Sequence, residues 1–347
     1  MGQESSGQQQ MWSLVGELPR QLEASWQQGA DGVQTRDVSA VKVVGMGGSA
    51  VAAELVGAVL DPARMSVSVL RDYALRHRPA PGTLLVFSSY SGNTEETLAA
   101  WEDAARYTPD CPRVIISSGG QLAKLAQAAS VPCISLPPDL PPRASLGHGV
   151  GALCALLEAV GDPGLAEQVP ATLQTLDSGN RRWGLDGQPA ADSSLEQLAA
   201  ALDGRLPVLY TGCALTHAVA RRWRGQINEN AKLLVTTAEL PELDHNEVVG
   251  WGQDTLVRQQ ARVVALRDCG EVGRIALRFS ATRQALGLSG DSWFERCTGP
   301  GPALARMMGL VQEGDVLSCL LARRAGVDPV PVKVIDGIKQ QLARESS

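Results

Sequence analysis

VKVVGMGGSA, residues 41–50, joins an apolar run to a glycine-rich turn, and this combination decides the fold class. The run of valines is typical of a buried strand, and the small residues from Gly45 onward are typical of a turn that enters a helix. A second turn rich in small residues, SSYSGNTEET, occupies residues 88–97 and follows the apolar run TLLVF. In an open parallel sheet such turns lie beyond the carboxyl ends of the strands, where ligands bind.

Further strand-like and helical patterns alternate around these two turns. Strands are expected at 41–47, 65–71, 83–89, 113–119 and 131–137, and helices between them at 49–60, 94–107, 121–129 and 149–161. Strands that alternate with helices require crossover connections, which build a parallel sheet covered by helices on both faces. We therefore predict an α/β fold for the first half of the chain.

The same alternation returns in the second half. Strands are expected at 206–213, 232–238, 261–268 and 292–299, with helices at 216–232 and 332–343. We expect an N-terminal domain over residues 1–160, an inter-domain helical region over 161–200 and a C-terminal domain over 201–347. The chain is therefore expected to consist of two similar α/β halves, although no sequence repeat proves a duplication.

Composition excludes several classes of function. The chain has 347 residues, 44% of them hydrophobic and 20% charged, with a net charge of −6. These values are typical of a globular protein and offer no basic surface for nucleic acid or an anionic membrane. There is no apolar run long enough to span a membrane, and MGQESSGQQQ at the start is polar, so we expect a cytoplasmic protein.

Cysteine and histidine usage argues against disulfides and metals. Seven cysteines occur without a CxxC pair, and we expect reduced thiols in the core. Four histidines occur without HxH or HExxH spacing, so no metal site and no other cofactor is expected.

The turn at 88–97 has the chemistry of an anion site. It supplies several hydroxyl side chains, and Gly92 permits an unusual backbone angle. Asn93 and Glu96 have the spacing of a capping box, so one alternative is that this turn only caps a helix. The turn at 45–50 also fits a dinucleotide-binding pattern, with Asp72 as the acid for the ribose. A phosphate, a carboxylate ligand and a dinucleotide all remain possible from the turns alone.

Six segments, taken together and in order, resemble the bifunctional phosphoglucose/phosphomannose isomerases of the sugar isomerase (SIS) superfamily. They are GMGGSA (45–50), SYSGNTEET (89–97), PPRASLG (141–147), INENAK (227–232), ELDHNE (242–247) and DPVPVKVIDGIKQQLA (328–343). The resemblance implies two SIS domains, each a flavodoxin-like parallel sheet flanked by helices. It also implies that the 6-phosphate of a hexose is held by Gly48, Ser49, Ser89, Ser91 and Thr94.

The resemblance further implies the catalytic residues of an aldose-ketose isomerase. Glu229 matches the glutamate that moves a proton between C2 and C1, and Arg143 matches the cation beside the enediolate oxygens. His245 matches the ring-opening histidine, which in this superfamily reaches in from the partner subunit of a homodimer. Glu242, Asp244 and Glu247 surround it in the sequence and should favour its charged form. Lys339 matches a C-terminal lysine that assists ring opening.

One sequence feature bears on the identity of the substrate. Members of the family that accept mannose 6-phosphate as well as glucose 6-phosphate carry a small hydroxyl residue ahead of the terminal lysine, and VDPVPVKVIDGIK has neither Ser nor Thr. A non-catalytic sugar-phosphate-binding protein of SIS type and an isomerase of another phosphosugar are the alternatives.

Overall fold

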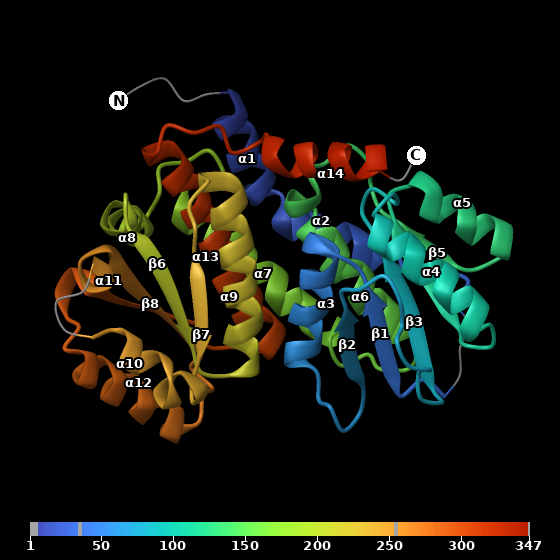
Figure 1. Ribbon diagram of the computed structural model, residues 1–347, viewed down its shortest axis with the longest axis horizontal. Coiled ribbons are helices and arrows are strands. Elements are labelled where there is room, and N and C mark those ends of the chain that lie inside the picture. Colours follow the sequence, from blue (N-terminus) through green and yellow to red (C-terminus); the bar gives the residue numbers. More distant parts are fainter. Residues whose placement is uncertain (1–5, 34–36, 253–255, 346–347) are drawn as a thin grey trace.

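The first half of the chain contains a sheet of five parallel strands. The computed structural model describes residues 6–33, 37–252 and 256–345 (Figure 1). The strand order is β2-β1-β3-β4-β5, with bounds β1 (Ala40–Val44), β2 (Ser66–Leu70), β3 (Thr83–Ser88), β4 (Arg113–Ser117) and β5 (Cys133–Ser135). This is the flavodoxin-like order, in which β1 and β3 are neighbours whose connections leave toward opposite sides. Their carboxyl ends therefore form the switch point where a ligand is expected.

The second half contains a smaller sheet of the same kind. Its order is β7-β6-β8-β9, all parallel, with bounds β6 (Leu206–Thr211), β7 (Thr236–Glu239), β8 (Ala261–Arg267) and β9 (Trp293–Cys297). In chain order this repeats the first sheet without its fifth strand. The predicted fold class, α/β with two parallel sheets flanked by helices, is confirmed.

Helices cover the faces of both sheets, which is why the inner strands have continuous apolar runs. Every residue of β3 is buried, as expected for a strand covered on both sides. The main helices are α1 (Ser6–Gly16), α2 (Leu18–Gln27), α3 (Gly47–Val59), α4 (Glu95–Tyr107), α5 (Gly120–Ala129), α6 (Leu146–Ala159), α7 (Val169–Trp183), α8 (Ser194–Leu202), α9 (Ala214–Gln226), α12 (Gly273–Leu286), α13 (Ala303–Arg324) and α14 (Lys333–Glu345). Two short helices, α10 (Glu247–Gly250) and α11 (Leu256–Gln260), lie between β7 and β8. No helix in the described part of the chain combines the length and apolar character needed to cross a membrane.

A shared core joins the two halves. One buried hydrophobic cluster includes Val43 of β1, Val86 of β3, Trp223 of α9 and Leu317 of α13. Helix α13 packs against α7, α8 and α9. The indole nitrogen of Trp223 donates to the carbonyl of Leu310 at 2.8 Å. The helices α3, α7 and α9 lie between the two sheets in Figure 1, so the halves meet through helices.

Ion pairs strengthen the same contact. The carboxylate of Glu54 on α3 accepts from Arg71, after β2, at 2.8 Å and from Arg221 on α9 at 2.5 Å. Glu54 is largely buried, with 13% of its side chain exposed, so the two arginines offset the cost of desolvating its charge. This carboxylate therefore links the first half to the second.

The cysteines are all free, but they are not all in the core. Cys154 and Cys319 are buried, and burial raises the pKa of each thiol to about 12. Cys269 and Cys297 are exposed. The prediction of core thiols is therefore wrong for these two, because both lie just beyond or at the ends of strands, where the chain leaves the sheet.

Candidate active site

The turn between β1 and α3 presents backbone donors at the switch point of the first sheet. Gly47 has φ of +50°, which turns the chain into the helix, and the N-cap residue Met46 makes no side-chain cap. In the described chain, the N–H groups of Gly47, Gly48 and Ser49 have no acceptor. Free N–H groups and the positive end of a helix favour an anion.

Gly48 brings this turn against the segment that carries Arg143. A Cβ at Gly48 would lie 3.0 Å from the carbonyl oxygen of Pro142 and 3.8 Å from the Cα of Arg143. A side chain here would need the neighbouring backbone to shift. The first turn is therefore next to the 3₁₀ turn Pro142–Ala144.

The turn after β3 brings the hydroxyls of Ser89 and Thr94 together. Ser89 is 2% exposed, and its Oγ is 2.8 Å from Oγ1 of Thr94 and accepts from the N–H of Gly92 at 3.1 Å. Gly92 has φ of +66°, and a Cβ there would lie 1.8 Å from the carbonyl oxygen of Gly119. Ser91 is exposed, and its Oγ accepts from the N–H of Asn93 at 3.3 Å. Only glycine fits this turn at position 92, and the turn holds Ser89 and Thr94 close together.

The expected capping box at Asn93 and Glu96 is not formed. Thr94 is the N-cap residue of α4, without a side-chain cap, and Asn93 Oδ1 accepts from the N–H of Gln121 at 2.9 Å. Asn93 thus fastens α5 to the turn instead of capping α4. The start of α4 is left without a side-chain cap, as an anion site requires.

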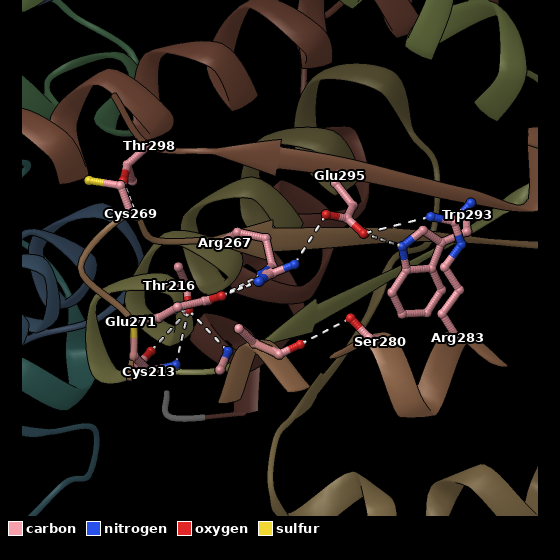
Figure 2. Close-up of polar contacts among 12 residues, drawn as sticks. Cys213, Thr216, Arg267, Cys269, Glu271, Ser280, Arg283, Trp293, Glu295 and Thr298 are labelled. Atoms are coloured by element: carbon pink, nitrogen blue, oxygen red, sulfur yellow. Dashed lines mark hydrogen bonds and ion pairs between the residues drawn. The ribbon is translucent and has the colours of Figure 1, made fainter. Parts of the chain in front are cut away.

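The corresponding turn of the second half is closed by its own side chain. After β6, Oγ1 of Thr216 accepts from the N–H groups of Gly212 and Cys213, both at 3.2 Å (Figure 2). A Cβ at Gly212 would lie 2.4 Å from Ile275 of α12, so a side chain has no space there either. The first half therefore provides the more open anion site.

Arg143 is buried and most of its donors are used. Its Nε donates to Asn230 Oδ1 at 2.7 Å, and its Nη2 donates to the carbonyls of Pro329 at 2.5 Å and Val330 at 2.8 Å. Its Nη1 faces Glu229, 3.7 Å from Oε2. Burial lowers the pKa of Arg143, but a guanidinium remains charged at neutral pH. The Nη1 group is the part of this cation that is directed toward Glu229.

A buried network fixes both the backbone and the side chain of Arg143. Asn230 donates to Ser318 Oγ at 2.9 Å, and Ser318 donates to the carbonyl of Asp315 at 2.7 Å. Arg222 binds the Asp315 carboxylate through Nε at 2.9 Å and Nη2 at 2.7 Å, and Nη2 also donates to the carbonyl of Arg143 at 2.8 Å. The chain of contacts thus returns to the residue where it began. Sequence reasoning missed Arg222 and Asp315, because nothing in their local patterns distinguishes them from surface charges.

Glu229 lies in a π-helical turn and faces a cavity. The turn spans Ile227–Ala231, a geometry that is frequent at functional sites. The side chain is 34% exposed. The cavity has a volume of about 580 Å³, and the residues lining it come from 228–234 and from 331–335 at the start of α14. A carboxylate beside a buried guanidinium can transfer a proton and stabilise an oxyanion, and the backbone of Arg143 adjoins the first anion turn.

Lys232 lines the same cavity and was not among the predicted site residues. It has φ of +57°, and its Nζ donates to the carbonyls of Glu229 at 2.5 Å and Pro331 at 2.8 Å. Burial and the nearby charge of Arg143 lower its pKa. Lys232 could have been predicted from its place in the INENAK segment, three residues after Glu229.

His245 and Lys339 are not brought to this cavity within one chain. His245 is exposed in the 3₁₀ turn Glu242–His245, which follows β7, whereas Glu229 precedes β7. The two residues therefore flank opposite ends of that strand. Lys339 is exposed on α14 and is not among the residues that line the described cavity.

The carboxylates near His245 in the sequence have other partners. Asp244 accepts from Arg278 and from Thr282, each at 2.7 Å, and Glu242 accepts from Asn246 at 2.8 Å. Among the described residues, neither of these carboxylates forms a hydrogen bond or ion pair with His245. The expectation that they favour a charged His245 is therefore not supported by a direct contact. Instead, the bonds of Asp244 to α12 hold the turn that displays His245 in place.

Among the described residues no three His, Cys, Asp or Glu side chains come together as a metal-binding group.

Comparisons with known proteins show which family this chain resembles. Residues 191–342 match the family model described as the bacterial phospho-glucose isomerase C-terminal SIS domain. A bifunctional phosphoglucose/phosphomannose isomerase of Caldicellulosiruptor bescii is 33% identical over 339 residues, which cover 96% of this chain and 99% of the relative. Another from Aquifex aeolicus is 32% identical, with 87% and 90% covered.

One solved structure illustrates the likeness of fold. The C-terminal domain of glucosamine-fructose-6-phosphate aminotransferase from Francisella tularensis superposes with a TM-score of 0.67 at 15% identity. The match covers 92% of this chain and 96% of that one. At this identity the likeness concerns the fold alone.

Proposed function

The chain belongs to the bifunctional phosphoglucose/phosphomannose isomerase family, and from this premise we propose that it interconverts glucose 6-phosphate and fructose 6-phosphate through a cis-enediol intermediate. The observation that carries the proposal is the position of Glu229 beside the buried Arg143, whose backbone adjoins the Gly48 turn at the β1/β3 switch point. The enzyme is an intramolecular oxidoreductase, since hydrogen moves between C2 and C1 of one molecule.

The phosphate is assigned to the two turns of the first half. The free N–H groups at Gly48 and Ser49 and the hydroxyls of Ser49, Ser89, Ser91 and Thr94 supply donors for its oxygens. Charge-assisted bonds of this kind are the stronger class of hydrogen bond.

Replacing both Ser89 and Thr94 with alanine is expected to weaken substrate binding more than turnover. Each lost bond to a charged group is worth about 1.5 to 3 kcal/mol, and the two hydroxyls share one contact, so KM should rise about tenfold to a hundredfold. Steady-state kinetics with glucose 6-phosphate measures this. The control is Ser280→Ala, which removes an exposed hydroxyl bonded only within α12. An unchanged KM in the double variant would place the phosphate elsewhere.

The proton transfer is assigned to Glu229 and the stabilisation of the enediolate to Arg143. The carboxylate takes the proton from C2 and returns it to C1, or the reverse. The Nη1 group of Arg143 stabilises the negative charge that develops on the neighbouring oxygens. Because one planar enediol serves both epimers at C2, mannose 6-phosphate can enter the same path.

The active form is proposed to be a homodimer in which His245 completes the site of the neighbouring subunit. Helix α14 has an exposed apolar stripe, Val334, Ile335, Ile338 and Leu342, that another protein surface could cover. The exposed position of His245, beyond the opposite end of β7 from Glu229, is in keeping with a role at another subunit's cavity. Ring opening is assigned to this histidine, with Lys339 beside it.

A cytoplasmic location is part of the proposal. It is supported by seven free cysteines, which suit a reducing compartment.

Purified protein treated with a chelator should convert glucose 6-phosphate to fructose 6-phosphate, because no described group of side chains has the composition of a metal site. Activity should not require added nicotinamide cofactor, which a dehydrogenase would need.

Mannose 6-phosphate should react more slowly than glucose 6-phosphate, since no Ser or Thr precedes Lys339 between Val327 and Ile338. Coupled assays with glucose 6-phosphate, mannose 6-phosphate and fructose 6-phosphate measure the rate for each substrate, with and without chelator and nicotinamide cofactor. Loss of activity on chelation with recovery on added zinc would contradict metal independence. Binding without turnover of any of the three would favour a sugar-phosphate-binding protein.

A further inference from the structure

Two cations hold the segment that connects α13 to α14: Arg143, which is buried, and Lys232, which is exposed. We call Pro329, Val330 and Pro331 the 329–331 strap. Arg143 Nη2 donates to the carbonyls of Pro329 and Val330, and Lys232 Nζ donates to the carbonyl of Pro331 at 2.8 Å and approaches that of Pro329 at 3.4 Å. All three carbonyls of the strap therefore face a cation.

Lys232 also binds the turn that carries Glu229. Its third contact is the carbonyl of Glu229 itself, at 2.5 Å. The left-handed backbone of Lys232, with φ of +57°, is uncommon for a residue with a side chain and ends the π-helical turn. One ammonium group thus joins the Glu229 turn to a point two residues before α14 begins.

The contacts of Lys232 argue against direct participation in the reaction. An ammonium has three N–H donors and no acceptor, and three carbonyl oxygens lie within 3.4 Å of Nζ. No donor is left for a substrate oxygen. A lysine that acted on substrate would need at least one donor free.

We propose that Lys232 is a positioning residue that fixes the 329–331 strap, and with it α14, relative to Glu229. The kinetic consequence of this inference rests on the proposed function, because α14 carries Lys339 and the first residues of α14 line the Glu229 cavity. Without the ammonium, the Glu229 turn and the start of α14 lose one of their two shared anchors, and the contacts of Arg143 remain. The phosphate turns lie in the first half and keep all of their contacts.

The test compares Lys232→Met with Lys232→Arg and with Lys124→Met. Methionine keeps the length and removes the donors, and arginine keeps donors for carbonyl oxygens. Lys124 is an exposed residue of α5, so its replacement controls for the loss of one positive charge. Two readouts are used: steady-state kinetics with glucose 6-phosphate, and hydrogen exchange of peptides covering α14.

Lys232→Met should lower kcat about tenfold to a hundredfold, because a displacement of about 1 Å at a catalytic site can cost a hundredfold in rate. KM should stay within about threefold of the wild-type value, since the phosphate contacts remain. Amides of α14 should exchange at least about threefold faster, reflecting more frequent local opening. Lys232→Arg should restore most of kcat and of the protection, and Lys124→Met should match wild type in both.

Several outcomes would overturn the inference. Unchanged exchange of α14 in Lys232→Met would do so, whether or not kcat falls, and so would a loss expressed in KM alone. If Lys232→Met does not fold, Lys232→Gln takes its place and should give a smaller change in the same direction. The exchange readout does not depend on activity, so a wild-type protein that lacks isomerase activity would refute the proposed function and leave the anchoring by Lys232 separately measurable.

Discussion

Replacing Glu229 with glutamine is expected to lower kcat about a thousandfold, within the range of 10² to 10⁴ that general acid–base catalysis contributes. The amide has the shape of the carboxylate but cannot accept the C2 proton. Exchange of the C2 hydrogen of the substrate with solvent should therefore be lost. KM should change little, because the phosphate is assigned to turns in the other half of the chain.

The design of this variant separates chemistry from structure. Lys232 binds the backbone carbonyl of Glu229 and not its carboxylate, so that contact survives the change. Glu102→Gln, at an exposed position of α4, is the matched control and should leave both kcat and exchange at wild-type values. If Glu229→Gln retains full exchange at C2, then another residue is the base.

Replacing His245 with alanine should lower turnover of the cyclic substrate about a hundredfold, because proton transfer in ring opening then lacks its acid and base. Reaction of the open-chain form should suffer much less, since Glu229 and Arg143 are intact. Stopped-flow measurements that follow the two forms separately can test this. Equal loss for both forms would mean that His245 does not act in ring opening.

Mixing the two variants tests whether the site is shared between subunits. In a dimer of one Glu229→Gln chain and one His245→Ala chain, one site combines an intact Glu229 with an intact His245, and the other has neither. Random exchange in a two-fold dimer should therefore restore about a quarter of wild-type activity. A mixture that stays inactive, although differently tagged subunits are shown to exchange, would rule out the shared site.

Much of the first sheet and its turns could be predicted from the sequence. Every residue of β3 is buried, and β1 buries Val41, Val43 and Val44, so hydrophobicity reveals both strands, and the small residues after them indicate turns. Helix α13 was not predicted, although it is 22 residues long. It is buried on most sides and also carries buried polar residues such as Gln312, Asp315 and Ser318, so no simple apolar stripe marks it.

The site was predictable only where its residues belong to local motifs. Glu229 and Arg143 were placed by the segments that contain them, and the structure brings the two together. Arg222 and Asp315 make contacts that no local sequence pattern encodes, including the bond from Arg222 to the distant carbonyl of Arg143. Lys232 lies in the INENAK segment, but its contacts with the 329–331 strap are distant in sequence. Roles for His245 and Lys339 stay predictions, because a single chain does not bring either to the cavity.

The core shared by the two halves limits how the molecule can move. Two domains joined by a small polar interface would open and close as rigid bodies around their ligand. Here a continuous hydrophobic cluster and the Glu54–Arg221 ion pair join the two halves, so hinge bending would expose apolar surface and separate a largely buried carboxylate from its partner. We therefore expect that entry of substrate and release of product depend on movements of smaller parts, such as surface loops and α14, while the two sheets keep their relative positions.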